Sequence, residues 1–239
     1  MSLENKRVVV LGGSSGIGLA VAQASAVEGA QVVVASSNAE RVQHAVSTLP
    51  TTCTGQVVNL LDETAVRTLF DEVGPFDHLV YTAGEPLALS PIDDTSLNQA
   101  RRFFELRYWG AFTAAKWGHK HIRSGGSIVF TSGVAGVRPG PGWSVAASIC
   151  SAMEAFTRGL AVELAPLRVN IVSPGVVKSP LWRNMDTAAR EALYASEEQR
   201  LLVGHVAEPK EIALGYLYLM SQSYGTGQTL VVDGGGLLT

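Results

Sequence analysis

A short glycine-rich segment near the start of the chain carries the residues best suited to chemistry. Gly12, Gly16 and Gly18 stand at its first, fifth and seventh positions. Gly12 allows a tight turn, Gly16 removes a Cβ where a pyrophosphate must approach the backbone, and Gly18 lets a helix pack close to a sheet. Backbone N–H groups at the start of such a helix can face an anion. The spacing therefore predicts phosphate binding.

The segments on either side of these glycines supply the necessary context. Residues 7–11 form an apolar, β-branched run that predicts a buried strand, and residues 19–30 predict a helix. Glycine pairs alone mostly mark tight turns, so the strand–turn–helix order is what favours a dinucleotide site. Residues 31–35 predict a second buried strand, which completes a βαβ unit with a right-handed crossover. The predicted cofactor-binding residues of this turn are Gly12, Ser14, Ser15, Gly16, Ile17 and Gly18.

The loop after the second strand indicates which nucleotide binds. In nicotinamide-binding folds an acid at this place holds the ribose 2′-hydroxyl, whereas small polar and basic residues leave room for a 2′-phosphate. This loop contains Ser36, Ser37 and Asn38, with Arg41 one turn further, and it has no acid before Glu40. NADP(H) is therefore favoured over NAD(H). The alternative is that the loop residues only cap the next helix, as serine and asparagine often do.

Length and composition limit the class of protein. A chain of 239 residues can form one compact α/β domain, and no linker or repeat suggests a second, so we expect a single domain over residues 1–239. A net charge of −3 provides no basic stripe, which argues against nucleic acid as a partner. Cys53 and Cys150 are the only cysteines, which suits a reducing compartment. With no signal peptide and no long apolar run, we expect a soluble cytoplasmic protein without a membrane partner.

The glycine spacing and three later motifs resemble the short-chain dehydrogenase/reductase family over nearly the whole chain. The later motifs, in order, are residues 125–129, 168–175 and 231–235. The resemblance implies a three-layer, doubly wound parallel sheet, the Rossmann fold, with a site for a nicotinamide cofactor. It also implies a small-molecule substrate that undergoes carbonyl reduction or alcohol oxidation.

The resemblance also implies further cofactor contacts. Asn59 and Leu60, at the end of a predicted strand over residues 56–60, correspond to residues beside the adenine, and relatives usually have Asp where Asn59 stands. An Asn side chain can still accept a hydrogen bond from the adenine amino group through its carbonyl oxygen. Nearer the nicotinamide, the resemblance assigns cofactor contacts to Ala83, Gly84, Pro174, Gly175, Val177 and Ser179.

The resemblance implies four catalytic groups, and this chain lacks all of them. Family members use a Tyr as acid/base, a Lys one helical turn later, a Ser that polarises the substrate oxygen and an Asn that orients a water relay. Residues 152–164 match the family's helix and set the register, which places Ala146 at the Tyr position and Cys150 at the Lys position. The Ser position falls on Gly133 and the Asn position on Arg107. A Tyr followed four residues later by Lys occurs nowhere in the chain.

Two functions from different classes remain open. The first is an NADP(H)-dependent oxidoreductase acting on a carbonyl or alcohol, because the cofactor itself carries the hydride chemistry and another residue could supply the proton. Candidates are Arg107, Ser132, Ser148 and Cys150. Arg107 could clamp an oxyanion or a carboxylate, or it could simply form a salt bridge. Cys150 could be a nucleophile, or it could be an inert packed thiol.

The second function is cofactor binding without turnover, as a sensor, a scaffold or a subunit of a mixed oligomer, since a fold does not entail an activity. Loss of a general acid typically costs a factor of roughly 10² to 10⁴ in rate. No metal site is predicted, because His119 and His121 are two residues apart and lie on different faces of a helix.

Two further segments are predicted from pattern and resemblance. Residues 96–122 predict one long helix with a broad aromatic surface that includes Trp109 and Phe112. In relatives this helix and the one over residues 145–164 form the subunit interface, so we expect a homodimer or homotetramer. Residues 180–207 are expected to form a variable lid, which does not identify the substrate.

Overall fold

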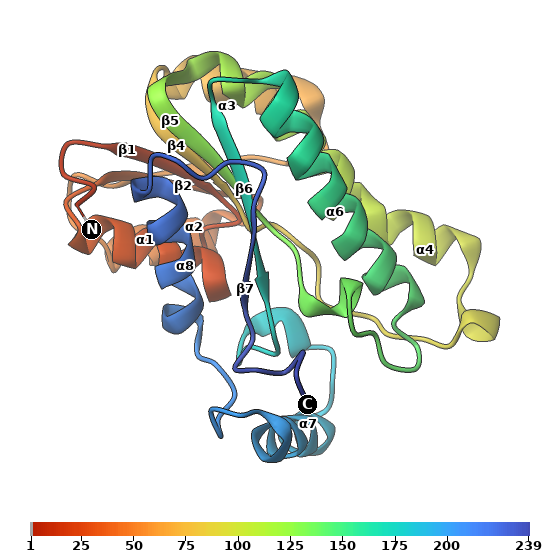
Figure 1. The fold of residues 1–239 in the computed structure, drawn as a ribbon. Coiled ribbons are helices and arrows are strands. Elements are labelled where there is room, and N and C mark those ends of the chain that lie inside the picture. Colours follow the sequence, from red (N-terminus) through yellow and green to blue (C-terminus); the bar gives the residue numbers. More distant parts are fainter. Residues whose placement is uncertain (1) are drawn as a thin grey trace.

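The computed structural model describes residues 2–239 as a seven-stranded parallel sheet between two layers of helices (Figure 1). The strand order is β3-β2-β1-β4-β5-β6-β7, and neighbouring strands pair in parallel. The chain builds outward from β1 on one side and then from β4 on the other. The direction of winding therefore reverses between β1 and β4, and ligands of doubly wound sheets bind outside the carboxyl ends of the strands at such a reversal.

The strands are short, as is usual for a buried parallel sheet. They are β1 (Arg7–Leu11), β2 (Gln31–Ser36), β3 (Thr54–Val57), β4 (Phe76–Tyr81), β5 (Ile122–Thr131), β6 (Arg168–Pro174) and β7 (Thr229–Val232).

The helices alternate with the strands and form the crossovers of the βαβ units. They are α1 (Gly16–Val27), α2 (Ala39–Ser47), α3 (Glu63–Val73), α4 (Leu97–Phe104), α5 (Ala111–Gly118), α6 (Ser144–Glu163), α7 (Thr187–Arg200) and α8 (Pro209–Ser221). One face of the sheet is covered by α1, α2 and α8, and the other by α3, α5 and α6 (Figure 1). The doubly wound, three-layer prediction is confirmed.

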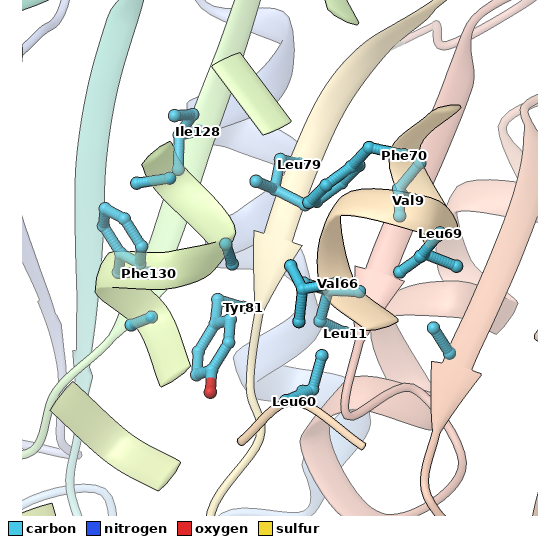
Figure 2. Packing of buried hydrophobic residues seen from close by; sticks show 14 of the residues in the cluster. Val9, Leu11, Leu60, Val66, Leu69, Phe70, Leu79, Tyr81, Ile128 and Phe130 are labelled. Carbon is cyan, nitrogen blue, oxygen red and sulfur yellow. The ribbon is translucent and has the colours of Figure 1, made fainter. Parts of the chain in front are cut away.

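Alternate residues of each central strand enter different cores, because side chains of a strand point to opposite faces. On β1, Val9 and Leu11 join the core under α3, α5 and α6, whereas Val8 and Val10 join the core under α1 and α8. Phe70 of α3 lies over the first of these cores, as Figure 2 shows, and its ring stacks on Phe76 at 5.8 Å between centroids. Burial on both faces holds the strand ends, and therefore the site built on them, in fixed positions.

Helix α6 packs along the sheet through Ile149, Met153 and Thr157, all of which are buried. The Thr157 hydroxyl donates a hydrogen bond to the Met153 carbonyl at 2.8 Å. Within residues 2–239, α6 is also the one helix whose length and composition would allow it to cross a membrane, a property that the core helix of a globular protein can share.

The prediction of one continuous helix over residues 96–122 is wrong. This segment is divided into α4, a wide turn over Glu105–Gly110 with π-helical hydrogen bonding, and α5. The Tyr81 hydroxyl donates a 2.5 Å hydrogen bond to the Leu106 carbonyl within this turn, and a side chain at Gly110 would overlap that hydroxyl. A side chain inserted into the helical ladder in this way accounts for the wider turn.

Several strand bounds also differ from the predicted ones. The third strand ends at Val57 and not at residue 60, because the Asn59 side chain accepts a hydrogen bond from the Leu61 N–H and closes a turn. The fifth strand begins at Ile122, before the motif over residues 125–129. The last strand, Thr229–Val232, overlaps only the first two residues of the motif over residues 231–235.

His78 on β4 supplies a prediction about stability and pH. The side chain is 3% exposed, its Nδ1 lies 2.9 Å from Ser127 Oγ, and burial lowers its pKa to about 4. Because the folded-state pKa lies below the unfolded-state value of about 6.5, this contribution to stability is complete above pH 6.5 and is lost as the pH falls toward 4. We expect a loss of roughly 2–3 kcal/mol from this residue between pH 7.5 and pH 4.5.

The measurement is urea unfolding at both pH values, with His78→Gln as the matched variant. Glutamine does not titrate and can still hydrogen-bond Ser127, so its loss of stability over this range should be smaller by that amount. The same pH dependence in both proteins would contradict the assignment.

Candidate functional site

A cavity of about 820 Å³ opens at the carboxyl ends of the central strands. Its walls come from the turn after β1, the ends of β2, β4, β5 and β6, the π-helical turn after α4, the start of α6, and α7. This is the edge of the sheet at which the winding direction reverses. Residues widely separated in sequence therefore meet around one elongated cavity.

The glycine turn is packed directly against the end of β4. A Cβ at Gly18 would overlap both the Gly12 carbonyl oxygen and Thr82 Oγ1, and a Cβ at Gly12 would lie 2.5 Å from the Ala83 nitrogen. The Thr82 hydroxyl in turn donates to the Leu11 carbonyl at 3.1 Å. Gly12 and Gly18 are therefore required by packing within the protein.

Gly16 has a different environment from the other two glycines. Its φ is +53°, and an added Cβ would meet only Pro180 Cδ at 3.3 Å and Ser179 Cβ at 3.6 Å, both in the segment that follows β6. Ser15 occupies the N-cap position of α1 with its hydroxyl free of any capping bond. The start of α1 is thus open toward the cavity, as a site for a phosphate requires.

The loop after β2 divides into residues that line the cavity and one that caps a helix. Ser36, Ser37 and Arg41 line the cavity. Asn38 is not among the lining residues: it is the N-cap of α2, and its Oδ1 accepts the Arg41 N–H at 2.8 Å. The capping interpretation therefore applies to Asn38, and this cap holds the first turn of α2 where Arg41 faces the cavity.

The remaining predicted cofactor residues line the same cavity. Asn59 and Leu60 form part of one end of the cavity. The Asn59 amide oxygen already accepts a hydrogen bond from the Leu61 N–H at 3.1 Å. At the other end the lining includes Ala83, Gly84, Pro174, Gly175, Val177 and Ser179.

The four positions that correspond to the family's catalytic groups lie together in this second end. Arg107, Gly133, Ala146 and Cys150 all line the cavity, although they come from three separate segments. A Cβ at Gly133 would lie 3.4 Å from Cys150 Sγ, so these two positions are in contact distance. Burial raises the pKa of the Cys150 thiol, which favours its neutral form. Neither the thiol nor the methyl group of Ala146 replaces a phenol activated by an ammonium group.

The serine candidates occupy different environments. Ser132 lines the cavity, and its hydroxyl lies 3.1 Å from the Cys150 carbonyl and 3.0 Å from Glu154 Oε1. Ser148 is exposed on α6, donates to the Val145 carbonyl at 2.8 Å and is not part of the cavity wall. The structure therefore brings Ser132, but not Ser148, to the candidate site.

Arg107 is held in the cavity wall by several contacts. Its Nη1 donates to Glu85 Oε2 at 2.8 Å, its Nη2 donates to the Glu85 carbonyl, and its guanidinium lies 4.3 Å from the centre of the Phe103 ring. Burial lowers the pKa of Arg107, but an arginine side chain remains charged at neutral pH. The interpretation of Arg107 as a salt-bridge residue is therefore correct for the edge of the guanidinium that faces Glu85.

Several contacts between lining residues were missed by sequence reasoning. Glu85 pairs with Arg107. Its place directly after the predicted cofactor residue Gly84 was the signal in the sequence that could have found it. Trp143 and Trp182 lie 6.2 Å apart between ring centres, and the Trp182 Nε1 donates to the Val177 carbonyl at 3.0 Å. These residues connect the predicted lid segment to the end of the cavity near Ala146, and no local pattern in the sequence indicates that contact.

The lid predicted over residues 180–207 contains a short 3₁₀ turn, Pro180–Trp182, followed by α7. Leu193, Glu197 and Arg200 of α7 line the cavity. Arg200 is fixed by Glu197 at 2.6 Å. Within the described residues 2–239, no group of three His, Cys, Asp or Glu side chains is placed to hold a metal ion.

The parallel sheet, the reversal point and the glycine turn define a nucleotide-binding Rossmann domain. Residues 12–236 match a family model described as enoyl-(acyl carrier protein) reductase. The short-chain dehydrogenase/reductase ATR9 of Stachybotrys chlorohalonatus is 36% identical, with 99% of each chain covered. The protein belongs to the short-chain dehydrogenase/reductase family, whose members bind nicotinamide cofactors.

Two solved structures are similar over nearly their whole length. A small-chain dehydrogenase in complex with NADPH has a TM-score of 0.87 and 37% identity, covering 99% of this chain and 100% of the other. The MalC reductase/Diels-Alderase of Malbranchea aurantiaca has a TM-score of 0.92 and 30% identity, covering 99% and 98%. The family and its fold, as predicted from the motifs, are confirmed.

Proposed function

We propose that this protein is an NADP(H)-dependent oxidoreductase that works on a small carbonyl or alcohol substrate without the family's Tyr and Lys. The observation that supports the proposal is the contrast between the two ends of one cavity. The end around Gly16 is built for a dinucleotide, whereas the end around Ala146 and Cys150 lacks an activated acid.

The residues present fit a nicotinamide dinucleotide along the whole cavity. The pyrophosphate would lie at the start of α1, where Gly16 has no side chain and the neighbouring backbone is open. Ser179 and Val177 would hold the nicotinamide end, and Asn59 and Leu60 the adenine end. Once bound, the nicotinamide would supply or accept a hydride. The protein's own part is to orient the substrate, exclude water beneath α7 and stabilise charge.

NADP(H) is proposed over NAD(H) because of the loop after β2. Arg41 makes no ion pair with any residue in 2–239, so its charge is available to a 2′-phosphate beside Ser36 and Ser37. A solved relative that is 37% identical was crystallised in complex with NADPH. A cytoplasmic location is proposed as well, because Cys53 and Cys150 are free thiols.

A second candidate function is cofactor binding without turnover. It is favoured by the combined presence of Ala146, Cys150 and Gly133 at three neighbouring positions of the cavity wall. The two candidates share the cofactor and differ in whether any substrate is converted.

We also propose a homodimer or homotetramer. Trp109 and Phe112 are 56% and 41% exposed on the wide turn and α5, and Val162 of α6 is 81% exposed. Phe112 stacks on Phe156 of α6 at 5.9 Å between ring centres, so the two segments lie side by side. We expect sedimentation at micromolar concentration to show a dimer or a larger species. Trp109→Glu should shift it toward monomer, and a protein that is only monomeric before any substitution would contradict the proposal.

The cofactor preference gives the next prediction. NADPH should bind at least about tenfold more tightly than NADH, because Arg41 can form a charge-assisted hydrogen bond with the 2′-phosphate. Titration followed by nicotinamide fluorescence measures both affinities. Arg41→Gln should remove most of the preference, and Ser36→Asp should move it toward NADH. Arg183→Gln, an exposed lid residue in the same cavity, is the control. Equal or tighter binding of NADH by the unaltered protein would refute the assignment.

Turnover of simple carbonyl compounds gives another prediction. NADPH oxidation with a panel of ketones and aldehydes should be slower by roughly 10² to 10⁴ than in the double variant Ala146→Tyr, Cys150→Lys, which restores the acid and its ammonium partner. The measurement is loss of absorbance of the reduced nicotinamide. Rapid turnover by the unaltered protein that survives changes at Arg107, Ser132 and Cys150 would contradict the proposal.

A further inference from the structure

The guanidinium of Arg107 is a largely buried cation with unused hydrogen-bond donors at the end of the cavity near Ala146. Its side chain is 14% exposed, and it lines the cavity next to Gly84, where a Cβ would lie 3.3 Å from both Nε and Nη2. Of the five N–H donors of an arginine, the bonds formed among residues 2–239 engage two, and Glu85 accepts both. The other donors are available to a ligand that lies over Gly84.

The orientation of this guanidinium is fixed by its surroundings. The Phe103 ring lies 4.3 Å from it, and Glu85 holds one edge through both a carboxylate and a backbone carbonyl. A donor group that is already oriented loses little freedom when it binds a developing charge, which is the requirement for electrostatic catalysis. Arg107 is therefore better suited to this role than a solvent-exposed arginine.

The other polar groups around Arg107 are unsuited to giving up a proton. The Tyr81 hydroxyl donates to the Leu106 carbonyl, and burial raises the pKa of Tyr81. Burial also raises the pKa of Cys150, and the Ser132 hydroxyl lies within hydrogen-bond distance of Glu154. An oxygen atom that gains negative charge at this wall meets a fixed cation instead of an acid.

This arrangement discriminates between classes of hydride acceptor. Hydride addition to a simple ketone leaves a localised, strongly basic alkoxide that needs a proton at oxygen. Hydride addition to the β-carbon of an α,β-unsaturated carbonyl compound leaves an enolate, whose charge is shared between oxygen and the α-carbon. The enolate needs its proton at carbon, and water can supply it after the hydride has been transferred.

We propose that Arg107 is the oxyanion-binding residue of this site, and that the substrate is an α,β-unsaturated carbonyl compound. The inference rests on the proposed NADP(H)-dependent function. In the step considered, the β-carbon would receive a hydride, which is one hydrogen with two electrons, from bound NADPH, and NADP⁺ would be left in the cavity. The π electrons of the C=C bond then form a double bond between the α-carbon and the carbonyl carbon. The π electrons of the carbonyl group move to its oxygen, which lies beside Arg107. Protonation of the α-carbon by water restores the carbonyl group and completes the reduction.

The binding test uses 4-nitrophenol as a probe, because its ionised form is a delocalised oxyanion and its two forms differ in visible absorbance. The protein is saturated with NADPH, whose reduced nicotinamide ring is uncharged, and the absorbance of the bound phenolate is followed as the pH is changed. We expect the pKa of the bound phenol to be lower than that of the free phenol by about one unit or more, since a neighbouring cation favours the charged form.

Two variants change this value in opposite directions. Arg107→Gln should abolish the lowering of the probe's pKa. Glu85→Gln should lower the pKa further, because the guanidinium then no longer shares its charge with the Glu85 carboxylate; a merely unstable variant would not produce that change. Arg67→Gln, an exposed arginine of α3 outside the cavity, is the control and should leave the value unchanged. A lowered pKa that survives Arg107→Gln, or a rise in Glu85→Gln, would overturn the role of Arg107.

Titration of the same variants with NADP⁺ separates this inference from the proposed function. The affinity for NADP⁺ should change less than about threefold in Arg107→Gln, which is well under 1 kcal/mol. A tenfold loss of NADP⁺ affinity without a change in the probe's pKa would make Arg107 a cofactor-holding residue and overturn the proposal. Failure of the unaltered protein to bind NADP⁺ or NADPH would instead refute the proposed function.

The substrate class is tested by NADPH consumption with cyclohex-2-enone and with cyclohexanone. We expect the enone to be reduced at least tenfold faster than the saturated ketone. Equal consumption with the two compounds, including none with either, would overturn the proposed class.

Discussion

The close approach of the glycine turn to the end of β4 is the contact on which the site depends. Gly18 lies so near the Gly12 carbonyl and Thr82 that no side chain fits, and Gly12 is equally close to the Ala83 nitrogen. This contact brings the start of α1 to the point where the sheet reverses its winding. The open backbone at Gly16 and the cavity wall around Gly84 both take their positions from it.

Much of the fold could be predicted from the sequence because its signals are local. The β-branched runs of a sheet buried on both faces, and the glycine spacing between the first strand and helix, need no knowledge of distant residues. The break between α4 and α5 depends on Tyr81, which is 25 residues from the Leu106 carbonyl that it contacts. The end of β3 depends on the orientation of the Asn59 side chain. Contacts of these kinds do not change the hydrophobic periodicity of the sequence, so the sequence does not predict them.

The candidate site was predictable in its glycine and loop residues and much less so in its charges. Ser36, Ser37 and Arg41 reach the cavity as predicted from their loop, whereas Asn38 is used as a helix cap. The pairing of Arg107 with Glu85 joins the wide turn after α4 to the loop after β4. That pairing determines how much of the guanidinium's charge a substrate encounters, and it is evident only in three dimensions.

The most direct test of this account is the affinity of Gly18→Ala for NADPH, measured by nicotinamide fluorescence with folding checked by circular dichroism. Gly159→Ala is the control, because nothing lies within 4 Å of a Cβ at Gly159. If the contact at Gly18 builds the cofactor site, Gly18→Ala loses at least about tenfold in affinity, or roughly 1.4 kcal/mol, and Gly159→Ala binds as the unaltered protein does. Unchanged NADPH affinity in a folded Gly18→Ala protein would contradict the account.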